Sequence, residues 1–282
     1  METRLGAFEA IADRVYRAIA EPDGVTLGLV VGDTSALVVD TGSTPEQGRQ
    51  LRAAAGFVAG SIPLEHVVVT HGHRDHLLGL AAFNGLTTWG HRDLAAGLGA
   101  GLTDAELAAR GISRDEVALP TRTFTLAATL DLGGAHAELV HFGRGHTGAD
   151  VVVIIPERGV VFVGDLLESA GFPSVGPDSS LDAWPRTLDG TLGTLRAHSL
   201  VVPGHGPVMD QAGAFIQRAE LAWLDGMLTQ AWDAGTPLED LWDATDQWPC
   251  TRAEAEAAAQ VRFAQFERLR RPRQRRLPLL GS

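Results

Sequence analysis

Short runs of valine and other β-branched or apolar residues recur along this chain and constrain its fold more than any other feature. They occupy residues 25–31, 36–40, 66–70, 151–155, 160–163 and 200–202. Their length and composition are typical of buried strands. Several of the segments between them are rich in helix formers, so we expect an α/β protein.

The clearest expected helix begins with Thr-Pro-Glu-Gln at residue 44, a capping residue followed by proline, and runs to residue 59. Further helices are expected at residues 77–83, 183–194, 212–234, 238–245 and 253–271. Residues 121–142 are expected to form a pair of strands that turns at Gly133 and Gly134. The glycine-, proline- and serine-rich residues 166–182 are expected to form a loop.

The pattern divides the chain near Asp210. Residues 1–210 contain the expected strands, whereas residues 211–282 contain none and are expected to form a helical C-terminal extension. The net charge of −12 is divided as well, because residues 261–282 carry seven arginines and one acid, which leaves −18 on the rest. A body this acidic repels a phosphate backbone, so we expect no nucleic-acid partner.

Composition also indicates the cellular compartment of the protein. No stretch approaches the roughly 18 consecutive apolar residues of a membrane span. The first 17 residues lack the apolar core of a secretory signal. The single cysteine, Cys250, excludes an intramolecular disulfide. We therefore expect a cytoplasmic protein without a membrane partner.

The strand expected at residues 65–70 leads directly into a histidine-rich motif, with His71, His73, Asp75 and His76 in its first six positions. These residues lie where a strand is expected to meet a helix. They need not take part in strand pairing there, so their side chains can converge. Neutral imidazoles and carboxylates are ligands that zinc and iron prefer. A histidine-rich surface loop is the alternative, and three histidines with one aspartate at this spacing argue against it.

Three further candidates lie beside glycine at the ends of expected strands: His146 in GRGHTGAD, Asp165 in VFVGD and His205 in VVPGHG. Each of them alone is explained as an ordinary turn residue. Together with the first motif they supply five histidines and two aspartates. That number of donors is sufficient for two metal ions that share one carboxylate.

This combination resembles the ligand set of the metallo-β-lactamase-fold hydrolases, and the resemblance spans roughly residues 20–210. It implies an αββα sandwich, in which two mixed sheets lie between helix layers and the metals bind at one edge of the sheets. In this family pattern the first metal ion is held by His71, His73 and His146. The second is held by Asp75, His76 and His205, and Asp165 bridges the two.

Other residues are open to two interpretations. Asp40, in LVVDTG, either begins a turn or, as the resemblance implies, accepts a hydrogen bond from a ligand histidine and fixes its orientation. His91 is expected to open a helix. The remaining histidines are expected in the core or at the surface: His66, His136, His141 and His198.

The branch of the family is indicated by what the chain has and lacks. An aspartate at position 165 resembles the glyoxalase-II-like and lactonase-like branches, because β-lactamases carry cysteine or serine there. Lysine, which often holds penicillin-type carboxylates, is absent, and the only tyrosine is Tyr16, far from the loop where lactonases place one. The loop at residues 166–182 resembles that of broadly distributed bacterial metallo-hydrolases. It is expected to form a pocket wall with Phe172, Pro173 and Trp184, or to be a surface loop with a core tryptophan.

The resemblance implies a hydrolase that holds two zinc ions per chain, with iron or manganese as alternatives. A metal-bound hydroxide would attack a small ester, thioester or lactone, and Asp75 would orient this nucleophile. The alternatives are a mononuclear iron oxidoreductase similar to persulfide dioxygenases, a β-lactamase-like amide hydrolase, a phosphodiesterase, or a metal-stabilised binding protein. The pattern does not identify substrate-binding residues.

The last expected helix, within residues 253–270, has a narrow apolar stripe. Its members are Ala257, Val261, Ala264, Phe266 and Leu269. In one interpretation the stripe packs on the chain's own body. In the other, residues 211–272 cover the pocket mouth or pair with a second copy in a homodimer. The arginine-rich tail would then lie in solvent or against the acidic body of a neighbour.

Overall fold

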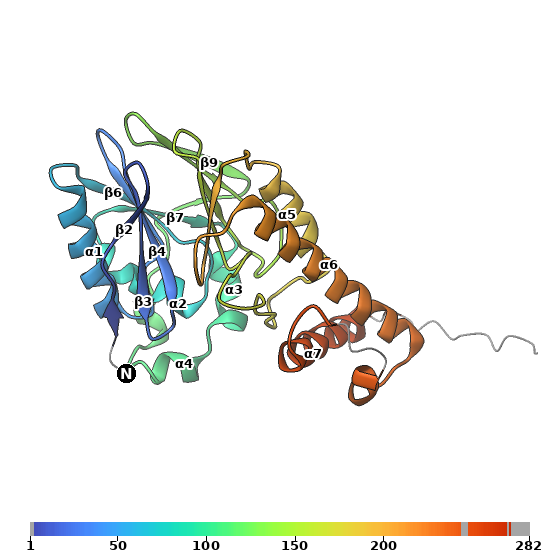
Figure 1. The fold of residues 1–282 in the computed structure, drawn as a ribbon. Coiled ribbons are helices and arrows are strands. Elements are labelled where there is room, and N and C mark those ends of the chain that lie inside the picture. Colours follow the sequence, from blue (N-terminus) through green and yellow to red (C-terminus); the bar gives the residue numbers. More distant parts are fainter. Residues whose placement is uncertain (1–2, 244–247, 270, 272–282) are drawn as a thin grey trace, which may run out of the picture.

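The computed structural model describes residues 3–243, 248–269 and 271, and Figure 1 shows two β-sheets with helices on their outer sides. The first sheet has eight strands in the order β1-β3-β4-β5-β6-β7-β8, with β2 beside β3. Its strands are β1 (Arg4–Leu5), β2 (Glu9–Ala12), β3 (Val15–Glu21), β4 (Val25–Val31), β5 (Ala36–Val39), β6 (Leu64–Val68), β7 (Thr87–His91) and β8 (Arg122–Phe124). The pairs from β5 to β8 are parallel, whereas β3, β4 and β5 pair antiparallel.

The second sheet has five strands in the order β13-β12-β11-β10-β9. They are β9 (Ala127–Asp131), β10 (His136–Val140), β11 (Val152–Ile155), β12 (Val160–Gly164) and β13 (Leu200–Pro203). Only β12 and β13 pair in parallel. Both sheets are therefore mixed, as the family resemblance implies.

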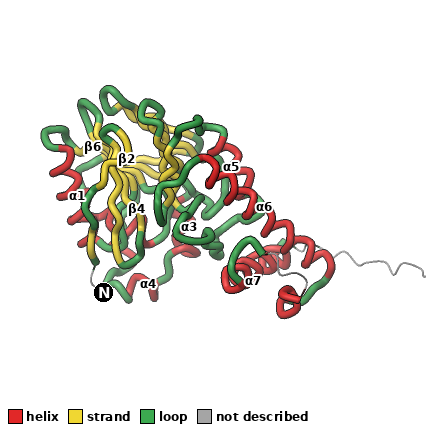
Figure 2. Tube along the Cα trace, viewed as in Figure 1, coloured by secondary structure: helices red, strands yellow, loops and turns green. Residues whose placement is uncertain are grey.

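The helices occupy the outer faces, as Figure 2 shows. The α-helices are α1 (Pro45–Ala59), α2 (Arg74–Leu77), α3 (Leu94–Gly101), α4 (Asp104–Ala108), α5 (Trp184–Leu192), α6 (Gln211–Ala234) and α7 (Arg252–Arg268). Three 3₁₀ helices are η1 (Leu78–Phe83), η2 (Arg114–Glu116) and η3 (Leu238–Asp243). The side chain of Thr44 caps α1 by accepting from Gln47 N, as its Thr-Pro motif predicts.

Three layers of buried side chains hold this sandwich together. Between the sheets, Leu37 and Val68 of the first sheet share a cluster with Val153 and Phe162 of the second. The outer face of the first sheet packs on α1 through Leu51. The outer face of the second sheet packs on α5, α6 and α7. The αββα architecture is therefore confirmed, and burial of these apolar faces supplies its main stabilisation.

Some elements differ from the sequence expectation. The strand expected at residues 121–132 is split, because β8 belongs to the first sheet and β9 to the second. The helix expected at residues 77–83 is a 3₁₀ helix, and His91 ends a strand instead of opening a helix. The sequence pattern did not indicate β1, β2 and β3, because charged residues interrupt their apolar residues.

The apolar stripe predicted for α7 is wrong in detail. Ala257, Ala264 and Leu269 are exposed, and Val261 is half-buried. The buried face instead contains Ala255, Ala258, Ala259, Arg262, Phe263 and Phe266. Arg262 can be buried on this face because its guanidinium pairs with the carboxylate of Asp225 of α6, 2.8 Å away.

The C-terminal helices share a core with the second sheet. Helix α6 begins at Gln211, next to the expected division at Asp210. Leu224 of α6 and Phe263 of α7 belong to the same buried cluster as Val161 of β12. This shared core supports the interpretation in which the helices pack on the chain's own body. Some expectations fall outside the described residues. These are the end of the helix expected at residues 238–245, which includes Thr245, and most of the arginine-rich tail, at Arg270 and residues 272–282. None of the described helices is long and apolar enough to cross a membrane.

Candidate metal centre

The seven candidate ligands come from separate loops that meet at one end of the sandwich. His71, His73, Asp75 and His76 lie just after β6 and in the first turn of α2. His146 lies between β10 and β11, Asp165 directly follows β12, and His205 follows β13. The ends of β6, β12 and β13 fix the backbone from which six of these side chains project, and the loop between β10 and β11 supplies His146. The sheet edge thus brings together residues up to 134 positions apart in sequence.

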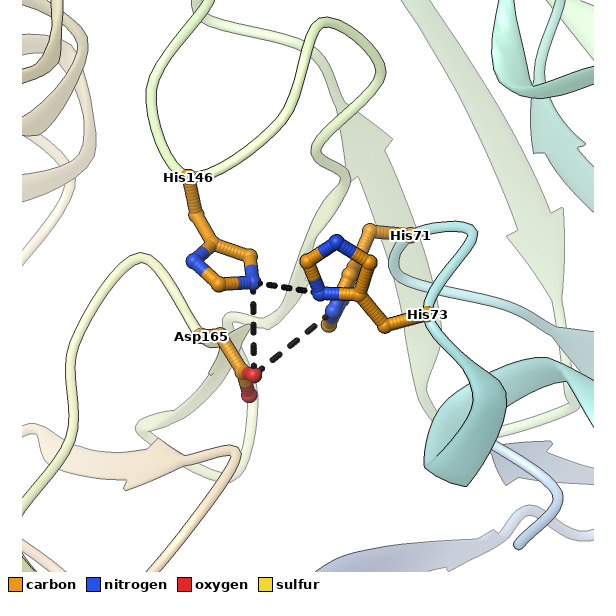
Figure 3. A group of neighbouring side chains, drawn as sticks. All are labelled: His71, His73, His146 and Asp165. Carbon is orange, nitrogen blue, oxygen red and sulfur yellow. Dashed lines mark hydrogen bonds and ion pairs between the residues drawn. The ribbon is translucent and has the colours of Figure 1, made fainter. Parts of the chain in front are cut away.

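The first group comprises His71, His73, His146 and Asp165, each with one ligand atom within 4.8 Å of the others. Figure 3 shows these four side chains pointing toward one another. Nε2 of His146 lies 2.8 Å from Nδ1 of His73 and 3.4 Å from Oδ2 of Asp165. Nε2 of His71 lies 3.6 Å from the same carboxylate oxygen.

The second group comprises Asp75, His76 and His205. Oδ2 of Asp75 lies 3.2 Å from Nε2 of His205 and 3.8 Å from Nε2 of His76. The two groups meet at Asp165, whose Oδ1 lies 3.1 Å from Nε2 of His76 and whose Oδ2 lies 3.6 Å from Nε2 of His205. The Asp165 carboxylate is therefore within 3.6 Å of histidines from both groups.

Several of these atoms are buried without a hydrogen bond. Nε2 of His71, Nε2 of His76 and Oδ1 of Asp165 make no hydrogen bond of good geometry, although the last two atoms lie 3.1 Å apart. Such groups are costly to bury, and a cation in the middle of the site would satisfy them. Imidazole and carboxylate donors in this number suit divalent ions of the zinc type. The residues present therefore fit the metal centre that the sequence pattern implies.

Gly204 is required by this arrangement. A Cβ atom at this position would lie 1.8 Å from Oδ1 of Asp165. Any larger residue would displace the carboxylate that lies between the two groups. The glycine beside His205 therefore has a steric role in the site.

Contacts behind the ligands hold their rings in place. Oδ2 of Asp40 lies 2.8 Å from Nδ1 of His76, and Oδ1 accepts from the Thr70 backbone N–H at 2.7 Å. The structure thus favours the orienting role for Asp40 over a simple turn role. Nδ1 of His146 lies 3.1 Å from the carbonyl oxygen of Ser174.

Asp178 is a site residue that sequence reasoning missed. Its Oδ2 lies 3.1 Å from Nε2 of His73, the nitrogen that faces away from the first group. The expected loop at residues 166–182 contains three aspartates or glutamates, and no local pattern distinguishes Asp178 among them. Only its position in space, 105 residues from His73, identifies it.

Burial and neighbouring charges shift the pKa values around the site. Burial, with His73 nearby, lowers the pKa of His146 to about 4. Burial also lowers the pKa of His71 well below its usual value. Both rings are therefore neutral at pH 7, which is the form that binds metal. Burial raises the pKa of Glu168 to about 7, and the Asp165 carboxylate adds to the increase.

A cavity of about 480 Å³ opens onto both groups. It is lined by Asp23, His73, Arg74, Asp75, Thr103, Glu106, His146, Asp165, Glu168, Ser174, Gly176, Pro177, Asp178 and His205. The loop after β12 therefore forms one wall, as expected, but through Glu168, Ser174 and residues 176–178. Phe172, Pro173 and Trp184 are not among the lining residues. Trp184 is buried and donates Nε1–H to the carbonyl of Leu166 at 3.0 Å, so the core interpretation holds for this residue.

The other histidines lie outside both groups. His91 stacks on His141 with ring centroids 4.0 Å apart. Nε2 of His91 lies 3.0 Å from the carbonyl oxygen of Thr125. These contacts account for His91 and His141 as structural residues, in agreement with the simpler expectation for His141.

The family model described as Metallo-beta-lactamase superfamily matches residues 20–221 of the chain. The chain belongs to this superfamily. Among curated members, it is 33% identical over 90 residues to a Metallo-beta-lactamase type 2 of Bacteroides fragilis, covering 31% of this chain and 36% of that protein. It is 29% identical over 147 residues to the type 2 enzyme of Bacillus sp. strain 170, covering 51% and 52%. It is also 28% identical over 203 residues to 2,4-dinitroanisole O-demethylase subunit alpha of Nocardioides, covering 71% and 55%.

The aligned part of the chain thus spans between about a third and just over half of these relatives' own lengths. Among solved structures, a metallo-beta-lactamase from Pontibacter korlensis matches 78% of this chain and 99% of that one, with a TM-score of 0.60 and 24% identity. One from Erythrobacter litoralis matches 77% and 95%, with a TM-score of 0.60 and 23% identity. These structural likenesses show that this chain has the metallo-β-lactamase fold.

Proposed function

We propose that the protein is a dinuclear, zinc-dependent hydrolase of a small ester, thioester or lactone. The observation that carries this proposal is the position of the Asp165 carboxylate, which lies close to histidines of both candidate ligand groups. One carboxylate shared by two ions reduces their mutual repulsion, and the remaining donors supply three ligands to each. Iron and manganese are alternative occupants of the same donors.

The candidate residues would have distinct roles in metal binding and in orienting the nucleophile. His71, His73 and His146 would hold one ion, Asp75, His76 and His205 the other, and Asp165 both. When bound, such ions lower the pKa of water to about 7 and polarise the carbonyl that is attacked. Asp75 lines the cavity and would orient the attacking water by accepting one of its hydrogen bonds. Asp40 and Asp178 would hold His76 and His73 in ligating orientations.

The choice of ester, thioester or lactone over β-lactam depends on the cavity. The β-lactamases named above supply the main alternative, an amide hydrolase. Penicillin-type substrates carry a carboxylate, and the single cation that lines this cavity, Arg74, is already paired with Asp23 and Glu106. The described residues therefore offer no unpaired cation in the cavity to hold a β-lactam carboxylate.

We further propose that the partner is a small molecule and that no nucleic acid or membrane is involved, in line with the acidic body. A cytoplasmic location is proposed from the use of one cysteine in 282 residues. The division into residues 1–210 and a helical extension is likewise proposed, since α6 begins at Gln211. A homodimer through the C-terminal helices remains a proposal as well.

The test is a substrate panel on protein whose metal content has been measured. Protein stripped by a chelator and reconstituted with zinc is assayed against esters, thioesters, lactones and β-lactams. Turnover of a carboxylic ester, thioester or lactone that disappears with the chelator and returns with zinc supports the proposal. Turnover of β-lactams alone would replace it with the amide hydrolase. One iron per chain, with oxygen consumption on glutathione persulfide, would replace it with the oxidoreductase.

A further inference from the structure

The cavity in front of the metal centre is polar and acidic throughout. Its lining contains six carboxylates, three histidines and a single arginine, and its only apolar side chain is that of Pro177. Two of the carboxylates, Asp75 and Asp165, belong to the candidate ligand groups. Long apolar acyl chains have no wall to pack against here, because ligand pockets for such groups are lined mainly by apolar side chains.

The cavity's arginine is already engaged. One guanidinium nitrogen of Arg74 lies 3.2 Å from Asp23, and the other lies 3.6 Å from Glu106. Asp23 also lies 3.9 Å from Arg110. Glu106 accepts from both the backbone N–H and the hydroxyl of Thr103. On this side of the cavity the charges therefore compensate one another.

On the opposite side, two carboxylates have no arginine partner among the described residues. Asp178 uses Oδ2 on His73, while its Oδ1 is buried with no hydrogen-bond partner, on a side chain that is only 10% exposed. Glu168 accepts one hydrogen bond, from the backbone N–H of Ser174 at 3.2 Å. Within the part of the chain that the structure describes, no arginine or histidine forms an ion pair with Glu168.

The position of Glu168 is fixed by its backbone. Its N–H donates to Oε1 of Gln217 at 2.8 Å, and its carbonyl accepts from Nε2 of Gln217 at 2.6 Å. Gln217 is itself buried in α6. The Glu168 carboxylate is thus held in the cavity by a rigid support, beside the candidate ligands Asp165 and His205.

From this arrangement we propose that Glu168 selects substrates whose substituent on this side of the cavity is cationic, and rejects those with an anion there. The inference rests on the proposed hydrolase and adds its substrate class: small, polar esters or thioesters that carry an ammonium or guanidinium group. A charge about 5 Å away, at an effective dielectric constant of about 20, changes binding by more than tenfold.

The test uses matched thioacetates on zinc-loaded protein at pH 8, above the pKa of about 7 that burial gives Glu168. Their thiol sides are 2-trimethylammonioethyl, 3,3-dimethylbutyl and 2-sulfonatoethyl, which differ mainly in charge, and the released thiol is measured by its absorbance with a disulfide reagent. A second series carries the same three groups on the acyl side. We expect kcat/KM to be at least tenfold higher for the cation than for the sulfonate in one series. In that series Glu168→Gln lowers this ratio at least tenfold, and Glu168→Asp retains it.

The control is Glu65→Gln, which removes the same charge from an exposed position on β6 and should leave the ratio within twofold of the wild type. Two results overturn the inference but leave the proposed hydrolase intact. One is hydrolysis of the thioesters with no preference for the cationic substrate, and the other is an unchanged cation-to-sulfonate ratio of kcat/KM in Glu168→Gln. If the thioesters are not hydrolysed at all, the hydrolase is challenged, and calorimetry with the corresponding amides decides the inference. Equal affinity for the cationic and anionic amides would overturn it.

Discussion

Replacing Asp40 with asparagine tests how far this residue controls the metal centre. Asp40 is 2% exposed and has a φ of 61°, a backbone conformation that asparagine also tolerates. Its carboxylate faces three groups: the Thr70 backbone N–H, the Thr70 hydroxyl and Nδ1 of His76. The substitution therefore preserves shape and backbone while it removes one acceptor and the charge.

An amide cannot satisfy all of these groups. If its oxygen accepts from the Thr70 N–H, its NH₂ group faces Nδ1 of His76. That nitrogen must then lose its proton, which leaves the proton on Nε2, the atom that faces Asp165. If the oxygen instead faces His76, the Thr70 N–H is left unsatisfied. The first outcome weakens metal binding by about 10- to 100-fold, and the second costs about 1–3 kcal/mol of folding stability.

Zinc affinity is measured by competition with a chromophoric chelator, and stability by urea unfolding of the metal-free protein. We expect Asp40→Asn to lower the zinc affinity at least tenfold, or to lower the free energy of unfolding by at least about 1 kcal/mol. Asp240→Asn, an exposed residue of η3, is the matched control. Wild-type zinc affinity together with wild-type stability in Asp40→Asn would refute the orienting role.

Three further outcomes are expected. His71→Ala and His146→Ala each abolish turnover with far-UV circular dichroism retained, whereas His136→Ala, outside both groups, leaves turnover unchanged; wild-type rates in either ligand variant would refute the site assignment. Truncation after Asp210 exposes the face of α5 and the second sheet that α6 and α7 cover, so the truncated protein should aggregate in size-exclusion chromatography, and a stable folded monomer would show that these helices are dispensable. Burial, with the Glu254 and Glu220 charges, raises the pKa of Cys250 to about 12, so its thiol should react with a disulfide reagent at pH 8 much more slowly in folded than in urea-unfolded protein, and equal rates would contradict this.

Much of the fold was predictable because its central strands are uniformly apolar. The strands β4, β5, β11 and β12 are buried along nearly their whole length, so their apolar runs stand out in the sequence. The first strands were not predictable by the same reasoning. In β3, Tyr16 and Arg17 point to opposite faces and both are only partly buried, and Arg17 pairs with Glu9 of β2. Strand β3 lies near the antiparallel end of its sheet, where the faces need not be fully buried, so such residues are tolerated there.

The site shows the same division between local and long-range information. The seven candidate ligands could be proposed from the sequence because four of them lie in one motif after a strand, and each of the other three stands beside glycine near a strand end. Asp178, Glu168 and the Arg74–Glu106 pair were not found, because their roles depend on loops that meet only in the folded chain. The stripe on α7 failed for a related reason, since a buried ion pair admits Arg262 to an otherwise apolar face.

The central claim is that two metal ions share the Asp165 carboxylate. Metal content by mass spectrometry, after reconstitution with zinc and removal of the excess, tests it most directly when wild type and Asp165→Ala are compared. We predict two zinc ions per wild-type chain and a value that falls toward one in Asp165→Ala, because the variant loses the carboxylate that lies between both histidine groups. A wild type that holds one ion or none, or an Asp165→Ala variant that retains two tightly bound ions, would contradict the shared-carboxylate centre.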